Sequence, residues 1–186
     1  MILPIVAYGD PVLNKIATDI QKEYPELQKL IADMYETMYS ANGVGLAAPQ
    51  IGRSIRLFIA DGTAIESLKE SGFKKIFINP EILEENGEEW AYEEGCLSIP
   101  GIRENVLRPS KLKVKYLDEN FNERIEDYEG IAARIIQHEY DHIEGTLFVE
   151  HLSPLKKQLI KNKLSNISKG KVDVEYRMKF PMGPKR

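Results

Sequence analysis

One short segment of the chain combines two histidines with a glutamate at a spacing that suits metal chemistry. Residues 137–142 read QHEYDH and contain the pattern H-E-x-x-H. On a helix, His138 and His142 lie on one face and can bind a single metal ion, and Glu139 stands where a general base is needed. The alternative is a pair of core histidines, but two polar rings on a buried helix are costly unless they are ligated or hydrogen-bonded. Because Glu139 also occupies the position of the general base in this motif, we favour the metal site over the core histidines.

A catalytic metal site of this kind needs a third protein ligand, because such sites use three ligands and one open position. The longer motif H-E-x-x-H-x-x-G-x-x-H, which the chain matches as far as Gly145, would place a third histidine at position 148, where the chain has Phe148. A thermolysin-like site would instead take a glutamate about twenty residues after His142. Residues 156–168 contain no acidic residue that could serve as this ligand. His151 lies beyond the expected end of the helix. Cys96 is the other candidate, since a thiolate is a strong ligand for a borderline metal, although a lone cysteine is often a small buried apolar residue.

Apolar spacing predicts three helices that would position these groups. Residues 24–42 form an amphipathic pattern that ends at Asn42-Gly43, where we expect the glycine to adopt the left-handed conformation that closes a helix. Residues 130–144 form a second helix that ends at Gly145 and carries the two histidines. Residues 156–168 form a third, whose expected apolar stripe is Leu155, Leu159, Ile160, Leu164 and Ile167.

The remaining apolar runs predict strands. Residues 56–61 and 75–79 are short runs of this kind, separated by a variable loop with a helical turn at 62–72. Leu112, Val114 and Tyr116 alternate with lysines, which indicates a strand with one wet face. A turn at 118–122 leads into a return strand that ends near 128, and residues 172–180 are expected to be an extended terminal strand. Because strands come as meanders, the pattern favours an α+β fold over a doubly wound sheet.

Composition restricts the class of protein further. The chain has 186 residues, of which 42% are hydrophobic and 29% charged, which suits a single globular domain. No apolar run approaches the roughly 18 residues of a membrane span, and the N-terminus lacks the features of a secretory signal. A single cysteine allows no internal disulfide, so we expect a reducing cytoplasm.

The net charge of -4 conceals an uneven distribution. Residues 156–186 contain ten basic and two acidic residues, a local charge of +8, so residues 1–155 carry -12. Composition alone favours a solvated helix face over a segment that approaches a polyanion such as nucleic acid.

Three segments together resemble the signature motifs of the peptide deformylase family. They are GVGLAAPQ at 43–50, EGCLS at 94–98 and QHEYDH at 137–142, and they occur in the family's order and spacing. The resemblance covers residues 1–155, the expected catalytic domain. It says less about 156–186, which we expect to be a basic helix and extended tail of the same domain. It implies an α+β fold with antiparallel β-sheets packed around a central metal-binding helix, together with N-terminal and C-terminal helices.

The resemblance also implies an activity and the residues that perform it. Family members remove the formyl group from the N-terminal formyl-methionine of newly synthesised polypeptides and release formate. Cys96, His138 and His142 would hold one divalent metal ion, with Fe(II) favoured and Zn(II) or other divalent metals acceptable to the same ligands. Glu139 would move the proton of the attacking water to the departing amine. The Gln50 side chain and the Leu97 backbone N–H would stabilise the developing oxyanion.

Substrate contacts follow from the same resemblance. An extended peptide would lie along Gly43, Val44 and Gly45, with Gly95 and Arg103 also close to it. Glu94 and Arg108 would form an ion pair that supports the site, the alternative being two solvated charges. Arg134 stands where some relatives have an aliphatic residue, which would alter the side-chain pocket. Without the other motifs, Gly43 and Gly45 would indicate only a helix end and a tight turn.

Two other functions compete with this interpretation. One is a different metallohydrolase, such as a small peptidase built on the same helix; Cys96 as a ligand argues against it. The other is a non-enzymatic metal-binding or RNA-binding module, as the basic segment suggests; the presence of both Glu139 and Gln50 argues against it. The expected partners are formylated nascent peptides and, through residues 156–186, the ribosome. Neither DNA nor a membrane is expected as a partner.

Overall fold

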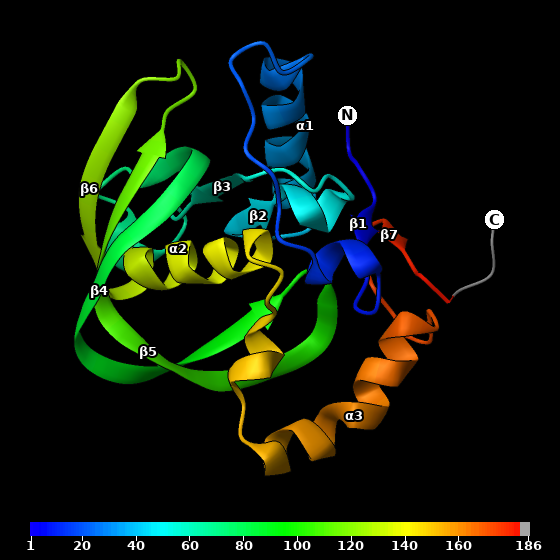
Figure 1. Cartoon of the computed structure of the whole chain (residues 1–186). Coiled ribbons are helices and arrows are strands. Elements are labelled where there is room, and N and C mark those ends of the chain that lie inside the picture. Colours follow the sequence, from blue (N-terminus) through cyan, green and yellow to red (C-terminus); the bar gives the residue numbers. More distant parts are fainter. Residues whose placement is uncertain (183–186) are drawn as a thin grey trace.

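The computed structural model describes residues 1–182, so Lys185 and Arg186 of the basic segment lie outside the described residues. The predicted α+β class is confirmed, and Figure 1 shows the arrangement. Five strands follow one another between α1 and α2, and the elements run along the chain as β1 (Ile5–Val6), α1 (Leu27–Ser40), β2 (Gly45–Ala47), β3 (Leu57–Asp61), β4 (Lys74–Cys96), β5 (Ile99–Leu117), β6 (Glu123–Glu129), α2 (Gly130–Ile143), α3 (Pro154–Ser168) and β7 (Met178–Lys179). No helix among these residues is long and apolar enough to cross a membrane.

Five strands form one antiparallel sheet in the order β2-β3-β4-β5-β6. Its longest strands are much longer than the sequence predicts: the strand expected at 75–79 continues to Cys96, and β5 begins at Ile99. The apolar periodicity of the sequence does not predict this part of β4, because much of 83–93 is exposed and rich in glutamate. Backbone hydrogen bonds to β5 stabilise the segment although it has no apolar face. In Figure 1 the two long strands curve around α2.

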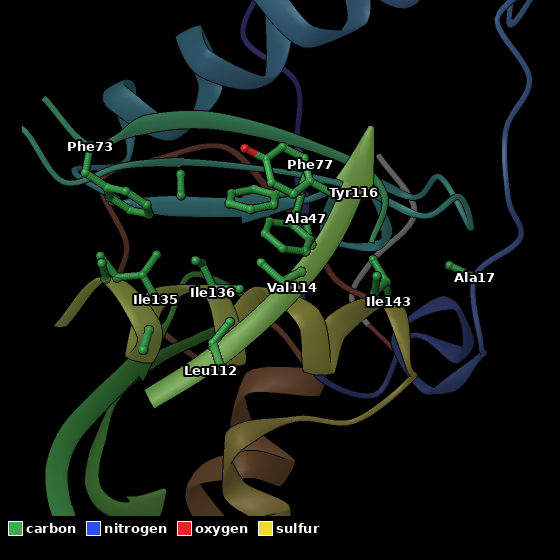
Figure 2. Packing of buried hydrophobic residues seen from close by; sticks show 14 residues of the cluster. Ala17, Ala47, Phe73, Phe77, Leu112, Val114, Tyr116, Ile135, Ile136 and Ile143 are labelled. Atoms are coloured by element: carbon green, nitrogen blue, oxygen red, sulfur yellow. The ribbon is translucent and has the colours of Figure 1, made fainter. Parts of the chain in front are cut away.

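Helix α2 packs its apolar side chains against this sheet. Figure 2 shows Ile135 and Ile136 directed toward Phe77 of β4 and Tyr116 of β5. The Phe77 and Tyr116 rings lie 4.5 Å apart between centroids, and each buried aromatic or aliphatic side chain contributes about 1.5–3 kcal/mol. The helix ends one residue earlier than the predicted 144, and Gly145 follows with a φ of +74°. This packing fixes the helix that carries the two histidines.

Helix α1 is shorter than the predicted range 24–42, and its C-terminus corrects one expectation. Asn42, not Gly43, adopts the left-handed conformation, with a φ of +55°. The N–H of Gly43 donates to the carbonyl of Met38 at 2.9 Å, which closes the helix in a Schellman arrangement. Glycine is required at position 43 for a steric reason instead, because a β-carbon there would lie 2.8 Å from Leu97 Cδ1. The helix end therefore packs against the turn that follows Cys96.

Helix α3 starts at Pro154, two residues before the predicted start, where the Ser153 side chain caps it by accepting the Lys156 N–H. Its apolar stripe is narrower than predicted. Leu155 and Leu159 are each 71% exposed, because they lie off the face that packs into the core. The residues that do pack inward are Ile160, Leu164 and Ile167.

The extended strand predicted for 172–180 is wrong for most of its length, because the backbone bends at 172 and at 175–176 and only β7 forms a ladder. Strand β7 pairs with β1 in a two-stranded parallel sheet, which brings residues 178–179 beside residues 5–6. Side chains at 172, 174, 176, 178 and 180 are half-buried, while the alternate positions are exposed. The loop at 62–72 contains the predicted helical turn, Glu66–Leu68. The domain boundary at 155 stays a prediction.

Candidate active site

Cys96, His138 and His142 converge on one point. Their sulfur and ring nitrogens all lie within 4.8 Å of one another, and Cys96 Sγ is 3.4 Å from His142 Nε2. Cys96 ends β4, where it pairs with Ile99, and Gly95 pairs with Arg103, so residues 100–102 of β5 have no partner on β4. Bulges of this kind re-aim side chains beside active sites. Here the bulge brings the thiol to the face of α2.

The competing third ligand lies elsewhere. His151 Nε2 is 2.8 Å from Asp141 Oδ2, and His151 is not part of the three-residue group. Phe148, at the position where the longer motif has a histidine, stacks on the ring of His138 with 5.9 Å between centroids. Of the two candidates that the residues left open, the geometry brings only Cys96 to the histidine pair.

Glu94 fixes the orientation of one histidine. Its Oε2 is 2.8 Å from His138 Nδ1, which leaves Nε2 to face the cluster. Arg108 forms a fork on the same carboxylate, at 2.8 Å and 3.1 Å, so the predicted ion pair is confirmed. Burial alone would raise the pKa of Glu94, but the hydrogen bonds from His138 and Arg108 outweigh it and lower that pKa. Glu94 is therefore a buried carboxylate whose partners keep it ionised.

Arg134 shares this carboxylate. Its guanidinium donates to Glu94 Oε1 at 2.9 Å and to the carbonyls of Trp90 and Val106 at 2.6 Å and 2.8 Å, and it stacks over the Trp90 ring. These bonds use both terminal nitrogens of the buried guanidinium, while its Nε has no hydrogen-bond partner among the described residues. Arg134 also lines the cavity, at the position where the family resemblance led us to expect an altered pocket.

Glu139 lies beside the cluster with one oxygen uncommitted. Glu139 Oε2 is buried and has no hydrogen-bond partner among the described residues. Burial raises the pKa of Glu139 to about 7, although the imidazoles of His138 and His142 act in the opposite direction. For Cys96, burial alone would raise the thiol pKa, but the same imidazoles outweigh it and lower that pKa to about 5. A thiolate and a carboxyl group poised near neutrality thus share one pocket.

Gln50 and Leu97 border the same point. The short 3₁₀ helix Ala48–Ile51 positions Gln50, whose Oε1 accepts the Ala47 N–H at 2.9 Å. This bond orients the amide so that Nε2 lies 3.4 Å from both Cys96 Sγ and Ser98 Oγ. Leu97 and Ser98 form the two-residue turn between β4 and β5. Both predicted oxyanion donors are therefore next to the cysteine.

A cavity of about 740 Å³ opens in front of this group. Gly43, Val44 and Gly45 line one side of it, next to strand β2 at the edge of the sheet. Gly95 and Arg103 line another part, where Arg103 Nε pairs with Glu93 Oε2 at 2.8 Å and the side chain is 62% exposed. All the residues predicted for catalysis, metal binding and substrate contact thus surround or line one cavity.

Sequence reasoning missed two contributors to this site. Ser98 is fully buried and contacts Gln50, but the sequence motif that contains it predicts no role for this side chain. Residues 173–176 of the tail also line the cavity. The alternation of Val172, Val174 and Tyr176 was a usable signal for a packed face, but nothing in the sequence showed which surface that face would meet.

Comparisons with known proteins agree with this geometry. The polypeptide deformylase family model matches residues 2–158. The peptide deformylase of Christiangramia forsetii is 57% identical over 194 residues, covering 100% of this chain and 99% of that protein, and that of Cytophaga hutchinsonii is 57% identical over 182 residues, covering 98% and 99%. The crystal structure of a peptide deformylase from Legionella pneumophila superimposes with a TM-score of 0.81 at 42% identity, covering 92% of this chain and 98% of that one. The chain belongs to the polypeptide deformylase family.

Proposed function

We propose that this chain hydrolyses the N-terminal formyl group of formyl-methionine on newly synthesised polypeptides and releases formate. One observation carries the proposal: the Cys96, His138 and His142 ligand atoms lie within 4.8 Å of one another, in a cavity bordered by a sheet edge and beside Glu139, whose buried Oε2 has no hydrogen-bond partner within residues 1–182. Family membership supports the same reaction.

Cys96, His138 and His142 would hold one divalent metal ion. The donor set of one sulfur and two nitrogens suits such an ion, and Glu94 already orients His138 so that Nε2 faces the cluster. When bound, the ion supplies Lewis-acid chemistry, which polarises a carbonyl and lowers the pKa of water. We propose Fe(II) on the family resemblance, with Zn(II) as the alternative that metal analysis would distinguish.

Glu139 is the proposed proton carrier. Its free Oε2 would accept the proton of the attacking water and then deliver it to the amine nitrogen that leaves. A carboxyl group whose pKa is about 7 can both accept and return a proton near neutral pH. Gln50 Nε2 and the Leu97 N–H would donate to the oxygen of the formyl group as it gains negative charge.

The substrate backbone would lie along the edge of strand β2. Within residues 1–182 this strand pairs with β3 on one side and with no strand on the other, so its free edge can bind an extended peptide by main-chain hydrogen bonds. Glycine is needed at this edge because a β-carbon on Gly43 would clash with Leu97 and a β-carbon on Gly45 would clash with Glu139. Gly95 and Arg103 would contact the peptide farther from the reacting bond.

The decisive experiment pairs metal analysis with a comparison of substrates. The purified protein should contain about one metal ion per chain and release formate from a formyl-Met peptide far faster than it releases acetate from the acetyl-Met peptide. Cleavage at an internal peptide bond of an acetylated peptide would support the small peptidase instead. Metal content without hydrolysis of any of these peptides would support a binding module.

We also propose that the basic C-terminal segment directs the enzyme to the ribosome in the cytoplasm, where its substrate emerges. Lys157, Lys161 and Lys163 are exposed on α3, and they would face the phosphates of ribosomal RNA. Changing the three to glutamate should weaken ribosome binding at low salt and leave hydrolysis of a short formyl-Met peptide intact. Unchanged ribosome binding would leave these lysines as a solvated face.

A further inference from the structure

The two-residue turn that follows Cys96 is bound by two segments remote in sequence, one near the N-terminus and one in the tail after α3. The Tyr8 N–H donates to the carbonyl of Ser98 at 2.8 Å. The Tyr176 hydroxyl donates to the carbonyl of Leu97, also at 2.8 Å. The turn that carries a proposed oxyanion donor is thus bound at both of its carbonyls by residues remote in sequence.

The tail reaches this turn because β7 anchors it. The carbonyls of Arg177 and Lys179 accept the N–H groups of Ile5 and Ala7, each at 2.9 Å. Directly before that anchor, Tyr176 is half-buried and packs against the same hydrophobic cluster as Leu97. Burial raises the pKa of Tyr176 to about 12, so its hydroxyl remains a donor at neutral pH.

The N–H and the carbonyl of Leu97 belong to two adjacent peptide units that are joined at the Leu97 α-carbon. Holding the carbonyl restricts the backbone angles of Leu97 and therefore the direction of its N–H. Within residues 1–182 that N–H donates to no protein acceptor. The Leu97 side chain is confined as well, because it packs against Gly43 so closely that a β-carbon there would lie 2.8 Å from Cδ1.

We infer that Tyr176 is a positioning residue for deformylation, holding the Leu97 carbonyl so that the N–H of the same residue points at the oxyanion. This inference rests on the proposed function. It makes the tail, which lies outside the 2–158 family match, a working part of the active site.

Tyr176→Phe tests the role by removing one hydroxyl. Tyr35→Phe is the matched control, since the Tyr35 hydroxyl also donates to a backbone carbonyl, that of Lys75 at 3.1 Å, but Tyr35 does not line the cavity. Because the oxyanion exists only in the transition state, Tyr176→Phe should lower kcat about tenfold and leave KM within about twofold. Tyr35→Phe should leave both unchanged, and the two variants should show similar losses in Tm.

A second measurement reports on the peptide itself. The amide signal of Leu97 in a ¹⁵N NMR spectrum of the protein loaded with diamagnetic Zn(II) should shift in Tyr176→Phe and stay in place in Tyr35→Phe. An unaltered kcat in Tyr176→Phe, or an unaltered Leu97 amide signal, overturns the inference while leaving the proposed function intact. Failure of the metal-loaded wild type to release formate overturns the proposed function, and this inference with it.

Discussion

Gly45 lies directly against the Glu139 carboxylate: a β-carbon on Gly45 would lie 2.3 Å from Glu139 Oε1. The two residues come from different elements, the edge strand β2 and the central helix α2. Gly45 has no positive φ, so the requirement for glycine here is one of space and not of backbone conformation. The edge strand thereby fixes how the proposed proton carrier is packed.

Gly45→Ala should displace the Glu139 side chain and reduce the deformylation rate by about 10²-fold, because small misplacements of reacting groups are costly. The measurement is kcat on a formyl-Met peptide, together with Tm. Gly62→Ala is the control, since a β-carbon there would lie 2.6 Å from Leu68 Cδ1, away from the cavity. The control should lose stability and keep its kcat. Equal kcat in both variants would contradict the role of the contact.

Glu139→Gln keeps the size of the side chain and removes its ability to carry the proton. General acid–base catalysis contributes about 10²–10⁴-fold, so the rate should fall by that order while the metal remains bound. Metal analysis and formate release on the same preparation provide the check. Turnover within a few-fold of the wild type would mean that another group moves the proton.

Cys96→Ala should leave substoichiometric metal and background activity, because it removes one of three ligands. His151→Ala is the matched control, since His151 was the competing ligand on sequence grounds and contacts Asp141 instead. We expect the control to keep about one metal ion per chain. A Cys96→Ala protein with full metal content and normal turnover would eliminate Cys96 as a ligand.

Much of the site was predictable because its residues lie in short motifs. His138, Glu139 and His142 need only one helix to share a face, and the apolar periodicity of that helix is clear in the sequence. Gln50 came from the family resemblance alone, and the resemblance also selected Cys96, which ligand chemistry had left open beside His151. Spacing left the third ligand open, because no local pattern reports where a distant strand will end.

The incorrect predictions have physical causes of their own. Strand β4 runs far beyond its apolar start because pairing with β5 continues through an exposed glutamate-rich stretch. Leu155 and Leu159 fit a helical stripe by number, yet the helix turns them to solvent. The contact of Tyr176 with Leu97 joins residues 79 apart in sequence, and only the pairing of β7 with β1 brings them together. Such contacts follow from topology, which periodicity does not contain.

Asp118 offers a test of stability far from the chemistry, in the turn between β5 and β6. Its Oδ1 accepts the N–H groups of Asn120 and Asn122 at 2.9 Å and 3.0 Å, and Arg124 pairs with Oδ2 at 2.9 Å. Burial alone would raise the pKa of Asp118, but the hydrogen bonds from Asn122 and Arg124 outweigh it and lower that pKa. The ionised carboxylate therefore organises the turn.

A carboxyl group whose pKa is lowered by folding stabilises the fold above its ordinary pKa of about 4, and that stability is lost as the pH falls through the lowered value. Asp118→Asn should thus be less stable than the wild type at pH 7, by on the order of 1 kcal/mol, and the difference should shrink below about pH 4. Urea unfolding at several pH values measures it. Asp127→Asn is the control, because that exposed side chain has only a 3.9 Å ion pair with Lys113, and its effect should be small at every pH. A difference for Asp118→Asn that stays constant down to pH 3 would show that the charge is not what holds the turn.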